Sequence, residues 1–193
     1  MFAHLIKPKL RMNQTLQTIL TRRSVKNYTA EPVPEALVEE VVKAGMYAPS
    51  GMNRQSPIIV AVTNPELRNK LSRMNLDIII GKQLKTSSGH SDPFYGAPVI
   101  LVVLAKKDCP TRVYDGSVVI ENMLIAAHSL GLGACWIHRA KEMFETEEGK
   151  ALLQALGITD EYEGIGHCIL GYPAPDALKP QSPRKPDYVV WVK

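Results

Sequence analysis

The chain has 193 residues, of which 45% are hydrophobic and 22% charged, and its formal net charge at pH 7 is +4. This length suits one domain that buries its core without disulfides or metal ions. So small a charge slightly favours small anionic ligands and gives no support to a nucleic-acid partner. Three scattered cysteines without a CxxC spacing indicate neither a disulfide framework nor a metal site.

Neither a membrane segment nor a targeting segment is indicated. No apolar run approaches the roughly 20 residues of a membrane helix. Residues 1–11 carry basic side chains without an apolar stretch or cleavage site. We therefore predict a leader of uncertain structure over 1–11, a single domain over 12–193 and a cytoplasmic location.

Helices and strands alternate in the first half. A helix with one apolar face is predicted over 13–23, and Pro34 suits the first turn of a second helix that ends near Tyr47. The β-branched run Ile58–Val62 is typical of a buried central strand. A helix from Asn64 and a second buried strand over 99–104 follow.

The next helix is apolar on nearly all sides. It is predicted to be capped by Asp115 and to end at Gly131, and a helix apolar all round is buried all round. One subunit of this size can hardly cover such a helix, so we expect it at the centre of a homodimer interface. A helix wrapped by its own chain is the alternative.

The second half ends in an extended arm. Strands are predicted over 134–137 and 167–170, with one amphipathic helix from Lys141 to Leu156 between them. Five prolines make 172–187 a stiff extended arm, and 188–192 has a good strand composition. An arm followed by a strand suits exchange onto a partner's sheet edge.

The run Arg22-Arg23-Ser24-Val25-Lys26 is the first candidate site. Two guanidiniums, a hydroxyl and an ammonium within five residues can hold a phosphate dianion. The alternative is a solvated helix end, where cations complement the helix dipole.

The loop from Ala48 to Pro57 is the second candidate. Ser50, Asn53 and Gln55 offer uncharged donors and acceptors for the polar edge of a heterocycle or its hydroxyls. The same residue types also make ordinary turns.

Two later segments are weaker candidates. Gly131–Gly133 follows a helix and opens a strand, which is the reverse of a dinucleotide-binding loop. Trp136 beyond it belongs either to the core or beside an aromatic ligand, and Arg184-Lys185 adds a second basic cluster to the arm. Because no nucleophile, carboxylate pair or metal motif stands out, a bound cofactor is expected to carry the chemistry.

In this order and with these gaps, the segments resemble the FMN-dependent nitroreductase family from Asn13 to Val192. The quoted motifs are Arg22-Arg23-Ser24, Ala-Pro-Ser-Gly-x-Asn-x-Gln from Ala48, Glu-Asn-Met-Leu from Glu121 with its Gly-Leu-Gly ending, and Pro-Arg-Lys-Pro from Pro183. Two departures stand out. Lys26 replaces a frequent arginine, and Ile58 stands where many members have an aromatic residue.

The resemblance implies an α+β fold with a mixed central sheet flanked by helices, and a homodimer that exchanges its C-terminal arm and strand. It also implies where FMN binds. The phosphate would be held by Arg22, Arg23, Ser24, Lys26 and Arg184 or Lys185, the flavin would be lined from the other subunit by Pro49, Ser50, Gly51, Asn53 and Gln55, and Ala134, Cys135 and Trp136 would lie against its ring.

The activity implied by the resemblance is a ping-pong oxidoreduction. Electrons would pass from NADH or NADPH through flavin N5 to a nitroaromatic, a quinone or a related small acceptor. Alternatives are dehalogenation or flavin fragmentation, set by lid residues within 81–95, and a non-redox flavin-binding module. No catalytic side chain is assigned.

Overall fold

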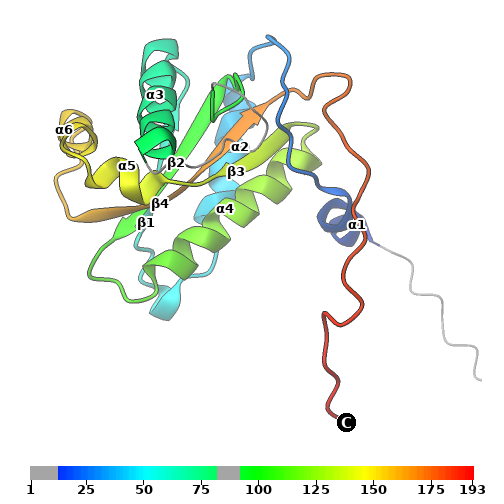
Figure 1. Cartoon of the computed structure of the whole chain (residues 1–193). Helices are drawn as coiled ribbons and strands as arrows, with labels where there is room; N and C mark the ends of the chain where they lie inside the picture. The colour runs from blue at the N-terminus through cyan, green and yellow to red at the C-terminus, as the bar shows by residue number, and fades with distance from the viewer. Residues whose placement is uncertain (1–12, 82–91) are drawn as a thin grey trace, which may run out of the picture.

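Helices and strands alternate along residues 13–81 and 92–193, the part of the chain that this computed structural model describes. The leader over 1–11 and most of the expected lid, residues 82–91, lie outside it. In chain order the elements are α1 (Gln14–Thr21), α2 (Glu35–Met46), a 3-10 turn (Gly51–Asn53), β1 (Pro57–Val62), α3 (Pro65–Gly81), β2 (Val99–Lys106), α4 (Arg112–Ser129), β3 (Gly133–Ile137), α5 (Ala140–Glu145), α6 (Glu147–Ala155) and β4 (Tyr162–Gly171) (Figure 1).

The four strands form one sheet in the order β1-β2-β4-β3, and every pair of neighbours is antiparallel. The α+β class is therefore confirmed. Within the described ranges the sheet is mixed only through a single parallel bridge between Ser24 and Ala134.

Strand β1 lies at an edge of this sheet, which corrects the expectation that Ile58–Val62 forms a central strand. Most of its residues are only half-buried, whereas β2 and β4 are buried almost throughout. A β-branched run indicates a strand, but the choice between edge and centre is made by pairing with residues far away in sequence.

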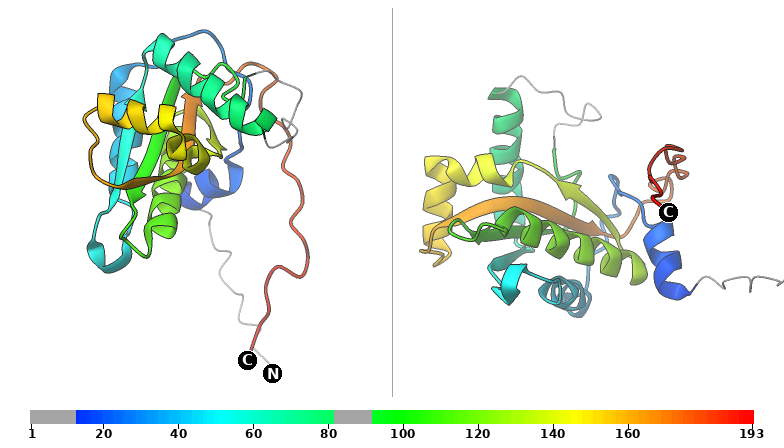
Figure 2. Two further views of the ribbon diagram at one scale, coloured as in Figure 1. Left: turned by 60° about the vertical axis from the view of Figure 1, so that its left-hand side comes forward. Right: turned by 90° about the horizontal axis from the view of Figure 1, so that it is seen from below.

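Helices cover both faces of the sheet, so the molecule has three layers (Figure 2). Helices α2 and α4 pack on one face through a cluster that includes Val41, Met123 and Leu101. Helices α3, α5 and α6 pack on the other face, around Leu71 and Phe144. Successive residues of β1, β2 and β3 point to opposite layers, which is the period of two that a pleated strand imposes. Strand β4 departs from this period at a register shift, so that Ile165 and Cys168 face the same layer.

Helix α4 begins earlier than expected, at Arg112, and Asp115 is a buried residue of its first turn rather than its cap. The chain itself buries much of the helix, including Ile120 and Met123. Along its outer side, Tyr114 and Val118 stay exposed in the single chain. The inner side of α4 is thus covered by its own chain, as the alternative expected. The predicted dimer interface can involve only the exposed outer side of α4.

The amphipathic segment from Lys141 to Leu156 is two helices rather than one. Thr146 ends α5 in an extended conformation and caps α6 by accepting a hydrogen bond from the Gly149 N–H at 3.0 Å. The two helices meet so closely that a Cβ on Gly149 would lie 2.1 Å from the Met143 carbonyl oxygen. The apolar spacing continues across this break and conceals it.

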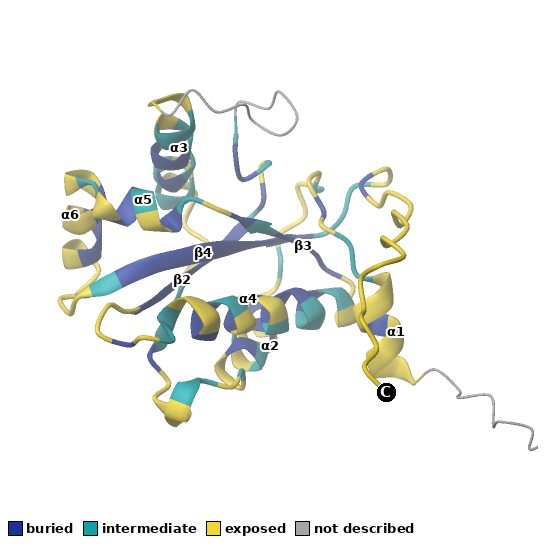
Figure 3. Ribbon diagram, turned by 60° about the horizontal axis from the view of Figure 1, so that its bottom comes forward, coloured by how far each residue is buried: buried dark blue, intermediate teal, exposed yellow. Residues whose placement is uncertain are grey.

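The C-terminal arm is attached to the body at its root. Thr29 N–H donates to the Tyr172 carbonyl at 2.9 Å, and Ala174 N–H donates to the Asn27 carbonyl at 3.1 Å. Beyond this root the arm is largely exposed and runs beside α1 (Figure 3). Residues 188–192 form no strand in the single chain, so their exchange onto a partner remains a prediction.

Candidate functional site

A basic pocket of about 250 Å³ lies between the end of α1 and the C-terminal arm. The polypeptide brings its two walls together from opposite ends of the sequence. Arg22, Arg23 and Ser24 form one wall, and residues 179–182 together with Arg184 form the other. Lys179 adds a cation that the sequence reasoning missed, because a lysine in a proline-rich arm has no distinguishing pattern.

The local backbone explains how the first wall is presented. Helix α1 ends when Arg22 N–H donates to the Thr18 carbonyl, and the chain then turns to extended structure. Val25 N–H donates to the Ala134 carbonyl at 3.0 Å, which fixes this extended segment against β3. The arginines therefore stand at a rigid junction rather than on a free helix end.

The two arginines differ in what they already bind. Arg23 Nη1 donates to the carbonyl oxygens of Leu20 and Arg22, at 3.1 and 2.6 Å. Arg22 Nε lies 3.8 Å from Glu121 Oε1, but its Nη1 is buried and donates no hydrogen bond within the described residues. A buried guanidinium donor without an acceptor is costly, so this nitrogen fits an anionic ligand.

The positive potential of this pocket also acts on a neighbouring helix. His128, near the end of α4, lies 2.9 Å from Thr21 Oγ1 through its Nε2. Burial, and then the charges of Arg22 and Arg23, lower the pKa of His128. The same field favours a bound anion.

The other two predicted phosphate ligands point elsewhere in the single chain. The Lys26 ammonium lies 5.5 Å from the centre of the Tyr95 ring, and that of Lys185 lies 5.7 Å from the Tyr188 ring. Neither lysine lines the basic pocket, whereas Arg184 does.

The loop from Pro49 to Gln55 forms a second site region. Pro49, Ser50 and Gln55 line a mainly apolar hollow of about 310 Å³ between α2, β1 and the loop. Gln55 Nε2 donates to Asn53 Oδ1 at 3.1 Å, and Gln55 N–H donates to Ser50 Oγ at 2.9 Å. The three residues predicted here, Ser50, Asn53 and Gln55, are thus joined by hydrogen bonds, one of which uses the Gln55 backbone.

The two regions lie at opposite ends of α4 in one chain. Gly51 N–H contacts Asp115 near the start of the helix, and Thr21 contacts His128 near its end. Asp115 and His128 are 13 positions apart along α4, a rise of roughly 20 Å. A single chain therefore does not bring the loop and the basic pocket together.

The segment Ala134–Trp136 lies in β3, beside the basic pocket. Ala134 and Trp136 face the layer of α2 and α4, and Cys135 faces the opposite layer. Burial raises the pKa of the Cys135 thiol, against smaller opposing effects of Ser24 and Lys26. This thiol is therefore neutral at ordinary pH and unsuited to nucleophilic attack.

Neither a metal cluster nor a membrane helix is found in the described ranges. No group of three or more His, Cys, Asp or Glu side chains there could hold a metal ion. No helix there is long and apolar enough to cross a membrane.

The fold and the two regions define a class: a three-layer α+β protein with an arginine-lined basic pocket and a distant polar loop. The Nitroreductase family model matches residues 19–172. The chain belongs to the nitroreductase family.

The similarity to known relatives extends over nearly the whole chain. A nitroreductase of Bacteroides fragilis, solved with bound FMN, is 31% identical with a TM-score of 0.81, over 94% of this chain and 100% of the other. A nitroreductase of Desulfitobacterium hafniense, also solved with FMN, is 26% identical with a TM-score of 0.84, over 95% and 100%. The NADPH-flavin oxidoreductase of Vibrio harveyi is 28% identical over 187 residues, which is 93% of this chain and 73% of the relative.

Proposed function

We propose that this protein is a homodimeric, FMN-dependent oxidoreductase that takes electrons from NADH or NADPH and reduces nitroaromatic, quinone or related small acceptors. One observation carries the proposal. A buried Arg22 nitrogen has no partner among the described residues, and the described charged residues that line its pocket are all cationic, within a chain of the nitroreductase family.

The residues present fit FMN. The basic pocket offers the guanidiniums of Arg22 and Arg184, the Lys179 ammonium and the Ser24 hydroxyl, and none of the described residues that line it is acidic. This donor set matches a phosphate monoester, because arginine binds phosphate oxygens in a bidentate manner. The loop supplies the uncharged donors and acceptors that suit a flavin ring and its ribityl chain.

The chain's own residues bind and orient, and none is assigned a nucleophilic role. When bound, FMN would supply two-electron redox chemistry between the nicotinamide donor and the acceptor, in the ping-pong order that the proposal implies. Arg22 and Arg184 would hold the phosphate, Ser50 and Asn53 of the partner's loop would offer hydrogen bonds to the ring system, and Trp136 would lie on the neighbouring strand β3.

A homodimer explains the distance between the two regions. In a two-fold dimer whose α4 helices run antiparallel across the interface, the loop at the start of one α4 would lie near the basic pocket at the end of the partner's α4. The exposed apolar stripe of α4 and residues 188–192 supply apolar surface for it.

Anaerobic spectroscopy tests the function. We expect yellow purified protein whose flavin absorbance is bleached by NADH or NADPH and restored by a nitroaromatic or a quinone. Flavin that stays oxidised with both donors would indicate a non-redox binding module. Bleached flavin restored only by a halogenated aromatic would indicate a dehalogenase. Colourless protein without affinity for FMN would refute the proposal.

A further inference from the structure

The loop from Pro49 to Gln55 has an unusual backbone. Met52, Asn53 and Gln55 all have positive φ, at 54°, 52° and 49°. Residues other than glycine rarely adopt this left-handed region, because their Cβ crowds the backbone there. Such a conformation persists only where neighbouring groups hold it in place.

One carboxylate connects this loop to the body of the protein. Gly51 N–H donates to Asp115 Oδ1 at 2.9 Å. The remaining hydrogen bonds described for residues 50–55 stay within that segment, such as those from Asn53 N–H to the Ser50 carbonyl and from Arg54 N–H to the Gly51 carbonyl. The strained segment thus depends on Asp115 for its polar attachment to another element.

Asp115 is itself held firmly. Its side chain is 4% exposed, and its second oxygen accepts a hydrogen bond from Thr111 Oγ1 at 2.8 Å. Cys109 Sγ lies 3.7 Å from the same oxygen. Asp115 makes no ion pair with the described residues, but its place in the first turn of α4 lets the helix dipole stabilise its charge.

Thr111 also sets the distance between the loop and α4. A Cβ on Gly51 would lie 2.5 Å from Thr111 Oγ1, so the backbone approaches α4 as closely as glycine allows. Thr111 and Asp115 together fix the position of the Gly51 backbone against the start of α4.

We infer that Asp115, oriented by Thr111, is a positioning residue that fixes the Pro49–Gln55 loop in the conformation that contacts the flavin of the partner subunit's pocket. The inference rests on the proposed function for the identity of the ligand. Asp115 touches no ligand itself and acts through Gly51.

Two measurements on the full-length protein test it. Hydrogen–deuterium exchange, with FMN removed, reports how firmly residues 49–55 are held. Titration with FMN, with visible circular dichroism of the bound flavin, reports whether the loop conformation reaches the ligand. The variants are Asp115→Ala, Asp115→Asn and Thr111→Val, and the matched control is Asp108→Asn, which removes an exposed carboxylate near the start of the same helix.

Asp115→Ala should speed exchange in 49–55, change the flavin dichroism and weaken FMN binding roughly 10- to 100-fold, the range for a lost charge-assisted hydrogen bond. Asp115→Asn keeps an acceptor without its charge, so a loss of about 3- to 10-fold is expected. Thr111→Val should fall between Asp115→Asn and wild type, and Asp108→Asn should match wild type.

Unchanged exchange in 49–55 would overturn the inference, as would faster exchange with unaltered FMN affinity and dichroism. If Asp115→Ala does not fold, Asp115→Asn and Thr111→Val decide the question. Wild-type protein that binds no FMN would refute the proposed function, while the exchange data would still decide whether Asp115 holds the loop.

Discussion

Arg22 and Arg23 share one wall of the basic pocket, but only Arg22 keeps a buried donor free for a ligand. We predict that replacing both by alanine lowers FMN affinity by at least the roughly 1.5–3 kcal/mol of one charge-assisted hydrogen bond. Arg22→Ala alone should account for most of this loss, because Arg23 Nη1 already donates to backbone carbonyls. Flavin fluorescence titration measures the affinity.

Arg73→Ala is the matched control, since Arg73 is an exposed arginine of α3 paired with Glu148. Its flavin affinity should equal that of wild type. Full flavin occupancy in the double variant would remove the phosphate role from this segment.

His167 lies at the centre of β4, and its burial leads to a second prediction for a single residue, the loss of stability at acid pH. It is fully buried, its Nδ1 lies 3.2 Å from the Ile137 carbonyl oxygen, and its Nε2 has no partner in the described ranges. Burial lowers the pKa of His167 from 6.5 to about 4. The neutral ring is therefore the form that the fold accepts.

The unfolded chain binds this proton more readily than the folded chain between pH 6.5 and 4. The contribution of His167 is thus fully present above pH 6.5 and is lost as pH falls from 6.5 to 4, by about 3 kcal/mol. His167→Gln removes this titration, and urea unfolding at four pH values measures it. The prediction fails if wild type and variant lose stability equally over this window.

Among single residues, Asp115 shows most clearly what could not be predicted from the sequence. Its position before an apolar run suggested a cap, and no local pattern predicted a partner sixty-four residues earlier in the loop. The arginine run and Arg184 were predictable because their types and order match a family. Lys179 was not, since only the path of the arm brings it to the pocket.

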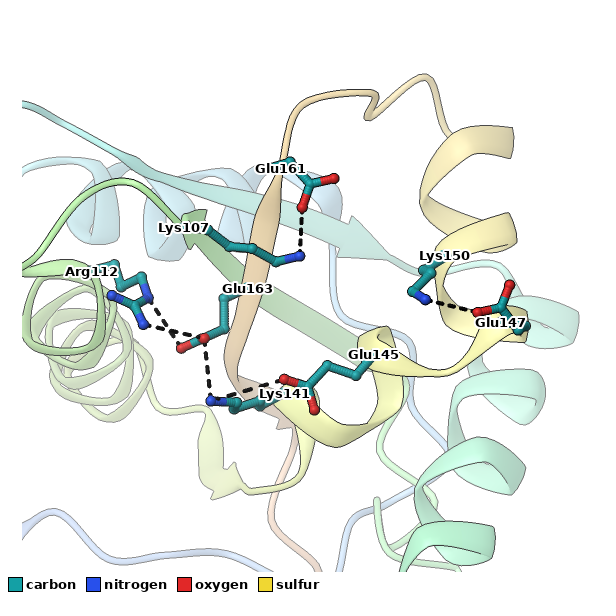
Figure 4. A network of polar contacts seen from close by, with 8 residues as sticks. All are labelled: Lys107, Arg112, Lys141, Glu145, Glu147, Lys150, Glu161 and Glu163. Carbon is teal, nitrogen blue, oxygen red and sulfur yellow. Dashed lines mark hydrogen bonds and ion pairs between the residues drawn. The ribbon is translucent and has the colours of Figure 1, made fainter.

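At the scale of elements, Glu163 connects β4 to the beginnings of α4 and α5 (Figure 4). Its side chain is 10% exposed and lies 3.3 Å from both Arg112 Nε and Lys141 Nζ. Glu163→Gln leaves a neutral amide beside two cations, of which Arg112 is 29% and Lys141 53% exposed. Because only the carboxylate is well buried, we expect a loss of about 1–3 kcal/mol in the free energy of unfolding, measured in urea, between the values for exposed and buried pairs.

Glu161→Gln provides the matched control, because Glu161 pairs with Lys107 at 2.6 Å but is 83% exposed. An exposed pair contributes about 0–1 kcal/mol, so this variant should stay near wild type. Equal losses in both variants would show that burial does not set the strength of the Glu163 contacts.

The strands and most helices were predictable from apolar periodicity, and the places where prediction failed share one cause. The break at Thr146 and the edge position of β1 depend on contacts between segments rather than on the residues of either segment. The close approach of Gly149 to Met143 goes with the turn at Thr146. The apolar pattern of α5 nevertheless continues into α6, so the sequence pattern does not reveal this turn.

At the scale of the whole molecule, the C-terminal segment is apolar and uncovered. Val190 and Trp191 are 87% and 79% exposed in the single chain, an arrangement that water disfavours. A second subunit with a free β1 edge offers backbone hydrogen bonds and apolar cover to such a segment. The single-chain structure thus contains both surfaces that the proposed exchange needs.

Deleting residues 188–193 tests this exchange without touching the basic pocket, whose arm residues 179–184 remain. We predict that sedimentation velocity finds a shift from dimer towards monomer, and that FMN affinity falls with it, because each site of the proposed dimer includes the partner's loop. Deleting Lys193 alone should change neither property. A truncated protein that stays dimeric and binds FMN as tightly as wild type would show that the strand composition of 188–192 serves another purpose. A dimer that persists with weakened FMN binding would instead place the exchanged segment against the site rather than in the interface.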